Sequence, residues 1–125
     1  MTVFESWASP PLISPGMYRD FVFLYEFVLV RQLKRLGVLA RPIVIGGDTS
    51  AIIGHLLETD ATLLISDYNA PLSLLIEKAR ATGVPVRANI DPKQVRSGSW
   101  DEVLTRVREI RTRRRSILRS WLELA

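Results

Sequence analysis

The stretch from Arg41 to Asp67, RPIVIGGDTSAIIGHLLETDATLLISD, has the pattern of a strand, a glycine turn, a helix and a second strand. Ile43 to Ile45 form an unbroken apolar run, as in a parallel strand that helices cover on both faces. A second apolar run, Ala61 to Ile65, predicts the next strand. Two parallel strands joined by a helix form a right-handed βαβ unit, and ligands collect beyond the carboxyl ends of such strands. One potential site face is therefore expected to hold Gly46, Gly47, Asp48, Ser66 and Asp67.

The helix inside this unit has an apolar stripe at helical spacing, formed by Ile52, Ile53, Leu56 and Leu57. Asp48, Thr49 or Ser50 is expected to cap its first turn. For Asp48 itself, capping is favoured over ligand binding. His55 is the only histidine, and its place beside the stripe favours a packing or surface role.

The chain before this unit reads as a strand, a loop and a helix. Thr2 to Glu5 suit a short strand, and the prolines at 10 and 11 stiffen the loop that follows. Ser14-Pro15 predicts the start of a helix that runs to Leu36, where Gly37 ends it. Between Phe21 and Val30 only Glu26 is charged, which indicates a helix buried on more than one side. This run is too short to span a membrane, so we expect another chain to cover its second face.

After the central unit, Pro71 to Ala81 predicts a helix with Leu72, Leu75, Ile76 and Ala79 facing inward. Residues 84–90 predict a fourth strand, and Asp91-Pro92 turns the chain out of it. Ser99 and Glu102 form a capping box for the last helix. The inner stripe of that helix is expected at Val103, Val107, Ile110, Ile117, Trp121 and Leu122.

Four strands that alternate with helices predict a parallel α/β fold. Four such units are half of a TIM-type (βα)8 barrel. The length of 125 residues suits a single domain, 1–125.

Composition narrows the function classes. The chain has no cysteine, which excludes disulfides, thiolate metal sites and cysteine nucleophiles and favours a cytoplasmic protein. One histidine without carboxylate partners at ligand spacing predicts no metal site, and the sequence implies no cofactor.

The last helix has a basic face, which we interpret as a solvated surface in preference to a nucleic-acid interface. Its arginines are Arg106, Arg108, Arg111, Arg113, Arg114, Arg115 and Arg119.

Four ordered motifs resemble the uroporphyrinogen decarboxylase family. FESWASPPLISPGMYRDFV, from Phe4, is similar to a family segment with a serine, an aromatic residue and a Ser-Pro helix start. IVIGGDTSAIIGHLLETDATLLISDY, from Ile43, resembles the family's strand with its Cys-Gly-Asp turn. Residues 87–92, RANIDP, are similar to the Gly-Asn-(Leu or Ile)-Asp-Pro turn, and SGSWDEV resembles the helix start that follows. The resemblance covers the C-terminal-central half of the family barrel.

This family includes uroporphyrinogen decarboxylases and corrinoid-dependent methyltransferases on eight-unit barrels. The resemblance implies substrate-binding roles for Ser6, Trp7, Gly47, Asp48, Asp67 and Asn89. For Asp67 a turn-capping role is equally favoured, and for Asn89 a structural turn is favoured. The decarboxylases' N-terminal arginines and aspartate and their late histidine have no counterpart here. The methyltransferases' zinc-binding His-x-Cys positions are Val44 and Gly46 in this chain, so zinc-activated thiol chemistry is not expected.

Three functions therefore stay open. The first is a decarboxylase-like half-barrel that pairs with a second copy, or with a complementary half-barrel chain, and binds a tetrapyrrole or another anionic small molecule. The second is a non-catalytic relative of the decarboxylases or methyltransferases that binds a ligand or a partner. The third, less favoured, is nucleic-acid binding through the arginine-rich helix.

Overall fold

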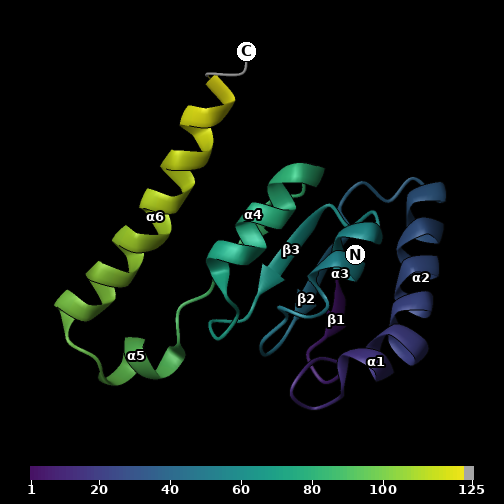
Figure 1. The fold of residues 1–125 in the computed structure, drawn as a ribbon, viewed down its shortest axis with the longest axis horizontal. Helices are drawn as coiled ribbons and strands as arrows, with labels where there is room; N and C mark the ends of the chain where they lie inside the picture. Colours follow the sequence, from purple (N-terminus) through teal and green to yellow (C-terminus); the bar gives the residue numbers. More distant parts are fainter. Residues whose placement is uncertain (123–125) are drawn as a thin grey trace. The chain divides into compact units, whose positions relative to one another are not determined.

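The computed structural model describes the backbone of residues 1–122 and the side chains of residues 1–111. Its centre is a parallel sheet with the strand order β1-β2-β3-β4 (Figure 1). The strands are β1 (Val3–Glu5), β2 (Pro42–Ile45), β3 (Leu63–Ser66) and β4 (Val86–Arg87). Each strand pairs with the next one along the chain, and helical segments connect them. This is the α/β half-barrel arrangement that the sequence predicts.

The first connection is helical, but it is not one regular α-helix. It consists of α1 (Pro15–Met17), a π-helical segment η1 (Tyr18–Phe23) and α2 (Leu24–Arg35). The side chain of Ser14 accepts the first-turn bond from the N–H of Met17 at 3.1 Å, as predicted. Gly37 has a φ of 77°, the left-handed conformation expected just after a helix. The π-helical segment is absent from the prediction because its hydrogen bonds leave no periodicity of their own over six residues.

The second connection contains α3 (Ile53–Glu58), which begins later than predicted. The prediction that Asp48, Thr49 or Ser50 caps this helix is wrong. Ile52 precedes the first turn and makes no side-chain capping bond. Asp48 instead accepts the N–H of Ser50 at 3.0 Å, which closes a tight turn before the helix.

The third connection is α4 (Leu72–Thr82), which ends at Gly83 in the left-handed conformation. The fourth strand is much shorter than the predicted segment 84–90. Its partner β3 ends at Ser66, and the chain then turns at Asp67, where the side chain accepts the N–H of Asn69. No ladder partner therefore continues beside the segment that follows Arg87.

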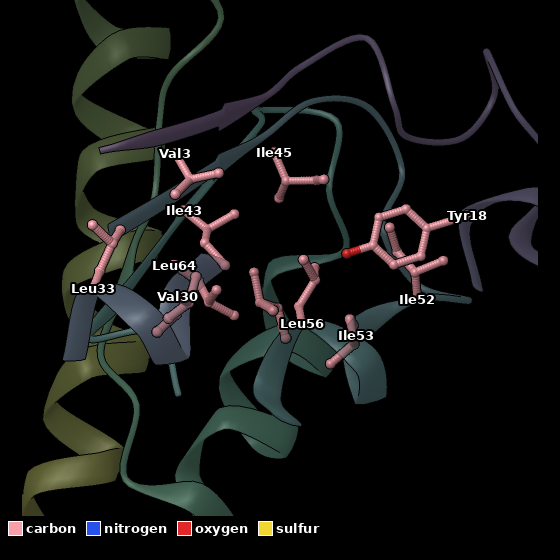
Figure 2. Packing of buried hydrophobic residues seen from close by; sticks show 12 residues of the cluster. Val3, Tyr18, Val30, Leu33, Ile43, Ile45, Ile52, Ile53, Leu56 and Leu64 are labelled. Atoms are coloured by element: carbon pink, nitrogen blue, oxygen red, sulfur yellow. The ribbon is translucent and has the colours of Figure 1, made fainter. Parts of the chain in front are cut away.

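The core lies between one face of the sheet and the helices. Figure 2 shows the side chains of Val3, Ile43 and Leu64 directed toward those of Val30 and Leu56. The alternate residues on the strands belong to the opposite face, where Phe4 is 72% exposed and Arg87 is also exposed. Register places Phe4, Val44, Ile65 and Arg87 in one row on that face. In a complete barrel this row would line the interior.

A second compact unit, residues 90–125, follows the sheet unit of residues 1–89. It contains α5 (Pro92–Ser97), which the sequence did not predict, and α6 (Trp100–Leu122). The capping box is confirmed, since the N–H of Ser99 donates to Glu102 Oε2 at 2.7 Å and the N–H of Glu102 donates to Ser99 Oγ. The predicted inner stripe is only partly buried at Val103 and Ile110, and Val107 is 43% exposed. Ile117, Trp121 and Leu122 lie outside the residues with described side chains.

Candidate functional site at the carboxyl ends of the strands

Four residues follow the carboxyl ends of the four parallel strands. The observed pairing joins Glu5 to Ile45 and Ile45 to Ser66, and it joins Ile65 to Arg87. Ser6, Gly46 and Asp67 come directly after the last paired residues of β1, β2 and β3, and Asn89 comes two residues after β4. We call these four residues the strand-end row. Because the strands are parallel, the row lies at one end of the sheet.

Gly46 and Gly47 allow the loop after β1 to pass close to the end of β2. A Cβ atom on Gly46 would lie 3.0 Å from the backbone oxygen of Ser6. Gly47 has a φ of 68°, and a Cβ atom there would lie 2.0 Å from the backbone oxygen of Pro10. Both positions need a glycine for packing. This close approach fixes the backbone of Ser6 beside the end of β2.

Asp48 and Asp67 both bind their own turns. Asp48 accepts bonds from the hydroxyl and the N–H of Ser50, and these bonds hold the pKa of Asp48 below its usual value. Asp67 Oδ1 accepts the N–H of Asn69 at 2.8 Å and its side-chain amide at 3.0 Å. Asp67 therefore has the turn-capping role that the sequence allowed. A carboxylate that accepts two bonds on one oxygen retains further acceptor sites for a ligand.

Ser66 does not belong to the site face, although the sequence placed it there. Ser66 pairs with Ile45, so its side chain lies on the same face of the sheet as that of Ile45, toward the helices. The side chain is 2% exposed, and its hydroxyl donates to the backbone oxygen of Arg87 at 3.3 Å. Trp7, by contrast, is 83% exposed, and Asn89 is partly buried just after β4.

Sequence reasoning missed a buried polar cluster on the opposite side of the sheet. The hydroxyl of Tyr18 donates to Glu26 Oε2, and Glu26 is only 3% exposed. Figure 2 shows this hydroxyl directed into the apolar core. The pKa of Glu26 is raised to about 7, chiefly by burial; the Tyr18 bond opposes this shift, and the nearby Glu5 adds to it. Burial also raises the pKa of Tyr18, and it raises the pKa of Glu5.

His55 packs against the aromatic side of this cluster. Its ring lies 4.6 Å from the ring of Phe23 and 6.4 Å from that of Tyr18, centroid to centroid. The packing interpretation of His55 is therefore confirmed. The sequence showed that Glu26 is the only charged residue in an apolar helical run. It did not show that Tyr18, eight residues earlier, is the hydrogen-bond partner of Glu26.

The structure also bears on metal ligands, membrane-spanning helices and the arginines of the last helix. In the described part of the chain, no three or more histidines, aspartates and glutamates are grouped closely enough to hold a metal ion. Along residues 1–122, no helix is both long and apolar enough to cross a bilayer. Arg106 pairs with Glu109 at 3.1 Å, while Arg113, Arg114, Arg115 and Arg119 lie outside the described side chains.

The strand-end row can hold a ligand by hydrogen bonds. Ser6 and Asn89 offer donors and acceptors, Asp67 offers an acceptor, and Trp7 offers an exposed aromatic face. Imidazole is absent from this face, because the only histidine lies among Phe23 and Tyr18 on the other side. The strand ends therefore offer hydrogen-bonding groups and an aromatic ring but no imidazole.

Comparison with known proteins gives one clear result. The model of the family described as uroporphyrinogen decarboxylase (URO-D) matches residues 1–118. Neither the curated proteins nor the solved structures contain a match to this chain. A family match over nearly the whole chain, together with parallel strands that alternate with helices, places this protein in the uroporphyrinogen decarboxylase family.

Proposed function

We propose that this chain supplies part of a binding site for an anionic, tetrapyrrole-like small molecule at the carboxyl ends of its strands. The observation that carries the proposal is that Ser6, Gly46, Asp67 and Asn89 all follow the carboxyl ends of neighbouring parallel strands. Family membership supports the ligand class. A cytoplasmic location remains a prediction from the absence of cysteine.

The chemistry of the row fits such a ligand. The Ser6 hydroxyl and the Asn89 amide can donate to carboxylate groups, and Asp67 can accept from pyrrole N–H groups. Trp7, which is 83% exposed, can stack on a flat conjugated ring. Gly46 lets the backbone of Ser6 pack beside the end of β2, because a Cβ atom at this position would lie 3.0 Å from the Ser6 backbone oxygen. Gly47 and Asp48 hold the adjoining turn in place and support the row indirectly.

Binding is tested by titrating the chain with uroporphyrin and following its absorbance and the quenching of tryptophan fluorescence. Asp67→Asn keeps an oxygen for the turn to Asn69 but removes the negative charge. We expect it to weaken binding by about tenfold or more, since hydrogen bonds to charged groups contribute about 1.5–3 kcal/mol. Asp20→Asn is the matched control, because Asp20 is an exposed acid paired with Arg19 on the helical segment η1. Equal weakening by both variants, or no binding by the parent chain, would contradict the proposal.

Decarboxylation is a separate question. His55 packs against Phe23, away from the strand ends, so Asp67 is the group of the strand-end row that could transfer a proton. Incubation with uroporphyrinogen distinguishes the two roles. Release of carbon dioxide and formation of porphyrins with fewer carboxyl groups would establish a lyase, whereas binding without these products would establish a non-catalytic member of the family.

A further inference from the structure

A groove of the sheet unit lies between β1, the loop that follows β1 and the helical segments α1 and η1. Figure 1 shows this loop beside α1. The volume of the groove is about 330 Å³, which falls within the range of about 300–1,000 Å³ that small-molecule sites occupy. Among the described residues that line it, only Glu5 is charged, and the others are apolar. The groove therefore has the size and the lining of a site for a small molecule with one charge.

Three aromatic side chains line this groove, and each comes from a different segment. Phe4 belongs to β1, Trp7 to the loop and Phe21 to η1. Their side chains are 72%, 83% and 70% exposed, so their rings are accessible to a ligand. The face of an aromatic ring carries partial negative charge and attracts a cation, and several rings together recognise substituted ammonium groups. The walls of the groove thus suit a cation with an apolar surface.

Glu5 supplies the charge of the groove without a cationic partner. In the described part of the chain, no ion pair involves Glu5. Burial raises the pKa of Glu5, and Glu5 in turn raises the pKa of the buried Glu26. The neighbouring hydroxyl of Tyr18 is already donated to Glu26. A partly buried carboxylate beside a second carboxyl group costs free energy unless a cation lies close to it. A cation in the groove would remove that cost.

We propose that this groove binds a small organic cation, a substituted ammonium group with an apolar body, between the Glu5 carboxylate and the rings of Trp7 and Phe21. The apolar walls contact its methyl or methylene groups, and the carboxylate balances its charge. A metal ion is a poor occupant, because one carboxyl group in an apolar lining offers too few oxygen ligands. The inference goes beyond the proposed function and does not rest on it, since Glu5 would repel an anionic ligand.

The need for a positive charge is tested on the parent chain by nuclear magnetic resonance of the tryptophan side-chain N–H groups. Choline is the probe, and neohexyl alcohol, in which a carbon atom replaces the nitrogen of choline, is its uncharged isostere. We expect choline to shift the signal of Trp7, assigned with Trp7→Phe, and to bind roughly tenfold more tightly than the isostere. Equal binding of the two molecules, or no shift with choline, would overturn the inference.

The role of the carboxylate is tested by Glu5→Gln, which keeps the size of the side chain and removes its charge. We expect this variant to bind choline roughly tenfold more weakly than the parent chain. Glu58→Gln is the matched control, because Glu58 is exposed on α3 and does not line the groove. Circular dichroism compares the folds of the two variants. Equal affinities of the two variants for choline would show that Glu5 does not contact the ligand.

The role of the aromatic rings is tested by Phe21→Leu, which keeps an apolar side chain and removes the ring. We expect choline to bind about two- to fivefold more weakly, the effect of one exposed ring on a cation. Tyr25→Leu is the matched control, because Tyr25 is 72% exposed on the adjoining α2 and does not line the groove. A loss of the same size in both variants would contradict binding in the groove.

The two proposals fail separately. Trp7 borders both sites, so the variants used here are at Glu5 and Phe21, which the proposed function does not use. If choline binding depends on Glu5 but uroporphyrin does not bind, the groove stands and the strand-end ligand is wrong. If Asp67→Asn weakens uroporphyrin binding selectively but choline binds no better than its isostere, the strand-end site stands and the groove inference is wrong.

Discussion

The substitution Glu26→Gln tests the buried polar cluster most directly. Glu26 is 3% exposed, and its pKa is raised from 4.5 to about 7, chiefly by burial. One pKa unit corresponds to about 1.4 kcal/mol, so the ionised carboxylate costs the folded state about 3 kcal/mol at alkaline pH. Gln keeps an oxygen that can accept the Tyr18 hydroxyl but cannot ionise. We therefore expect Glu26→Gln to be more stable than the parent chain above pH 8.

The sign of the pH dependence follows from the raised pKa of Glu26. Below about pH 4.5 the carboxyl is neutral in both the folded and unfolded states, so it contributes no pH-dependent penalty. As the pH rises toward 7, the unfolded chain releases this proton before the folded chain does, and the parent loses stability. The gap between the variant and the parent should thus open between about pH 4.5 and pH 8 and then level off.

The assay is urea unfolding followed by circular dichroism at several pH values and one fixed protein concentration. Glu58→Gln is the matched control, because Glu58 is exposed on α3. Tyr18→Phe removes the donor to Glu26 Oε2. Because this bond favours the ionised form, its loss should destabilise more above pH 8 than at pH 5. A stability difference between Glu26→Gln and the parent that does not change with pH would refute the reasoning.

Two further predictions concern turns and caps. Gly47→Ala should destabilise the sheet unit by about 1–3 kcal/mol, because φ is positive and the new Cβ would clash with the backbone oxygen of Pro10. Gly54→Ala is the control, because a Cβ atom at Gly54 on α3 would lie in open space. This variant should stabilise the fold by about 0.5–1 kcal/mol. Urea unfolding compares the two variants, and equal effects would argue against a packing role for Gly47. Ser99→Ala removes the hydroxyl that accepts from the N–H of Glu102, so helicity measured by circular dichroism should fall, with a loss of about 1 kcal/mol; unchanged helicity would show that this cap is dispensable.

The sequence determined much of the architecture by itself. Unbroken apolar runs identified β2 and β3, and Ser14, Gly37 and Gly83 marked helix ends that the structure confirms. These signals are local, because a cap or a left-handed turn depends on residues a few positions apart. The family motifs were likewise readable from the sequence, and the family match agrees with them.

Features that depend on distant neighbours could not be read in this way. The start of α3 was wrong because Asp48 satisfies its own turn with Ser50 before any helix begins. β4 was overestimated because its length depends on where β3 stops. Residues 84–90 have the composition of a strand, but composition does not supply a partner.

The candidate site shows the same division. The sequence named Ser6, Asp67 and Asn89 as separate motif residues, and only the order of the parallel strands placed them at one end of the sheet. It also placed Ser66 with them, although alternation directs Ser66 to the helix side. The pairing of Glu26 with Tyr18 arises when helix and sheet pack together. Local sequence determines which helices and strands form. Packing decides which residues share a face of the sheet and which carboxyl groups are desolvated.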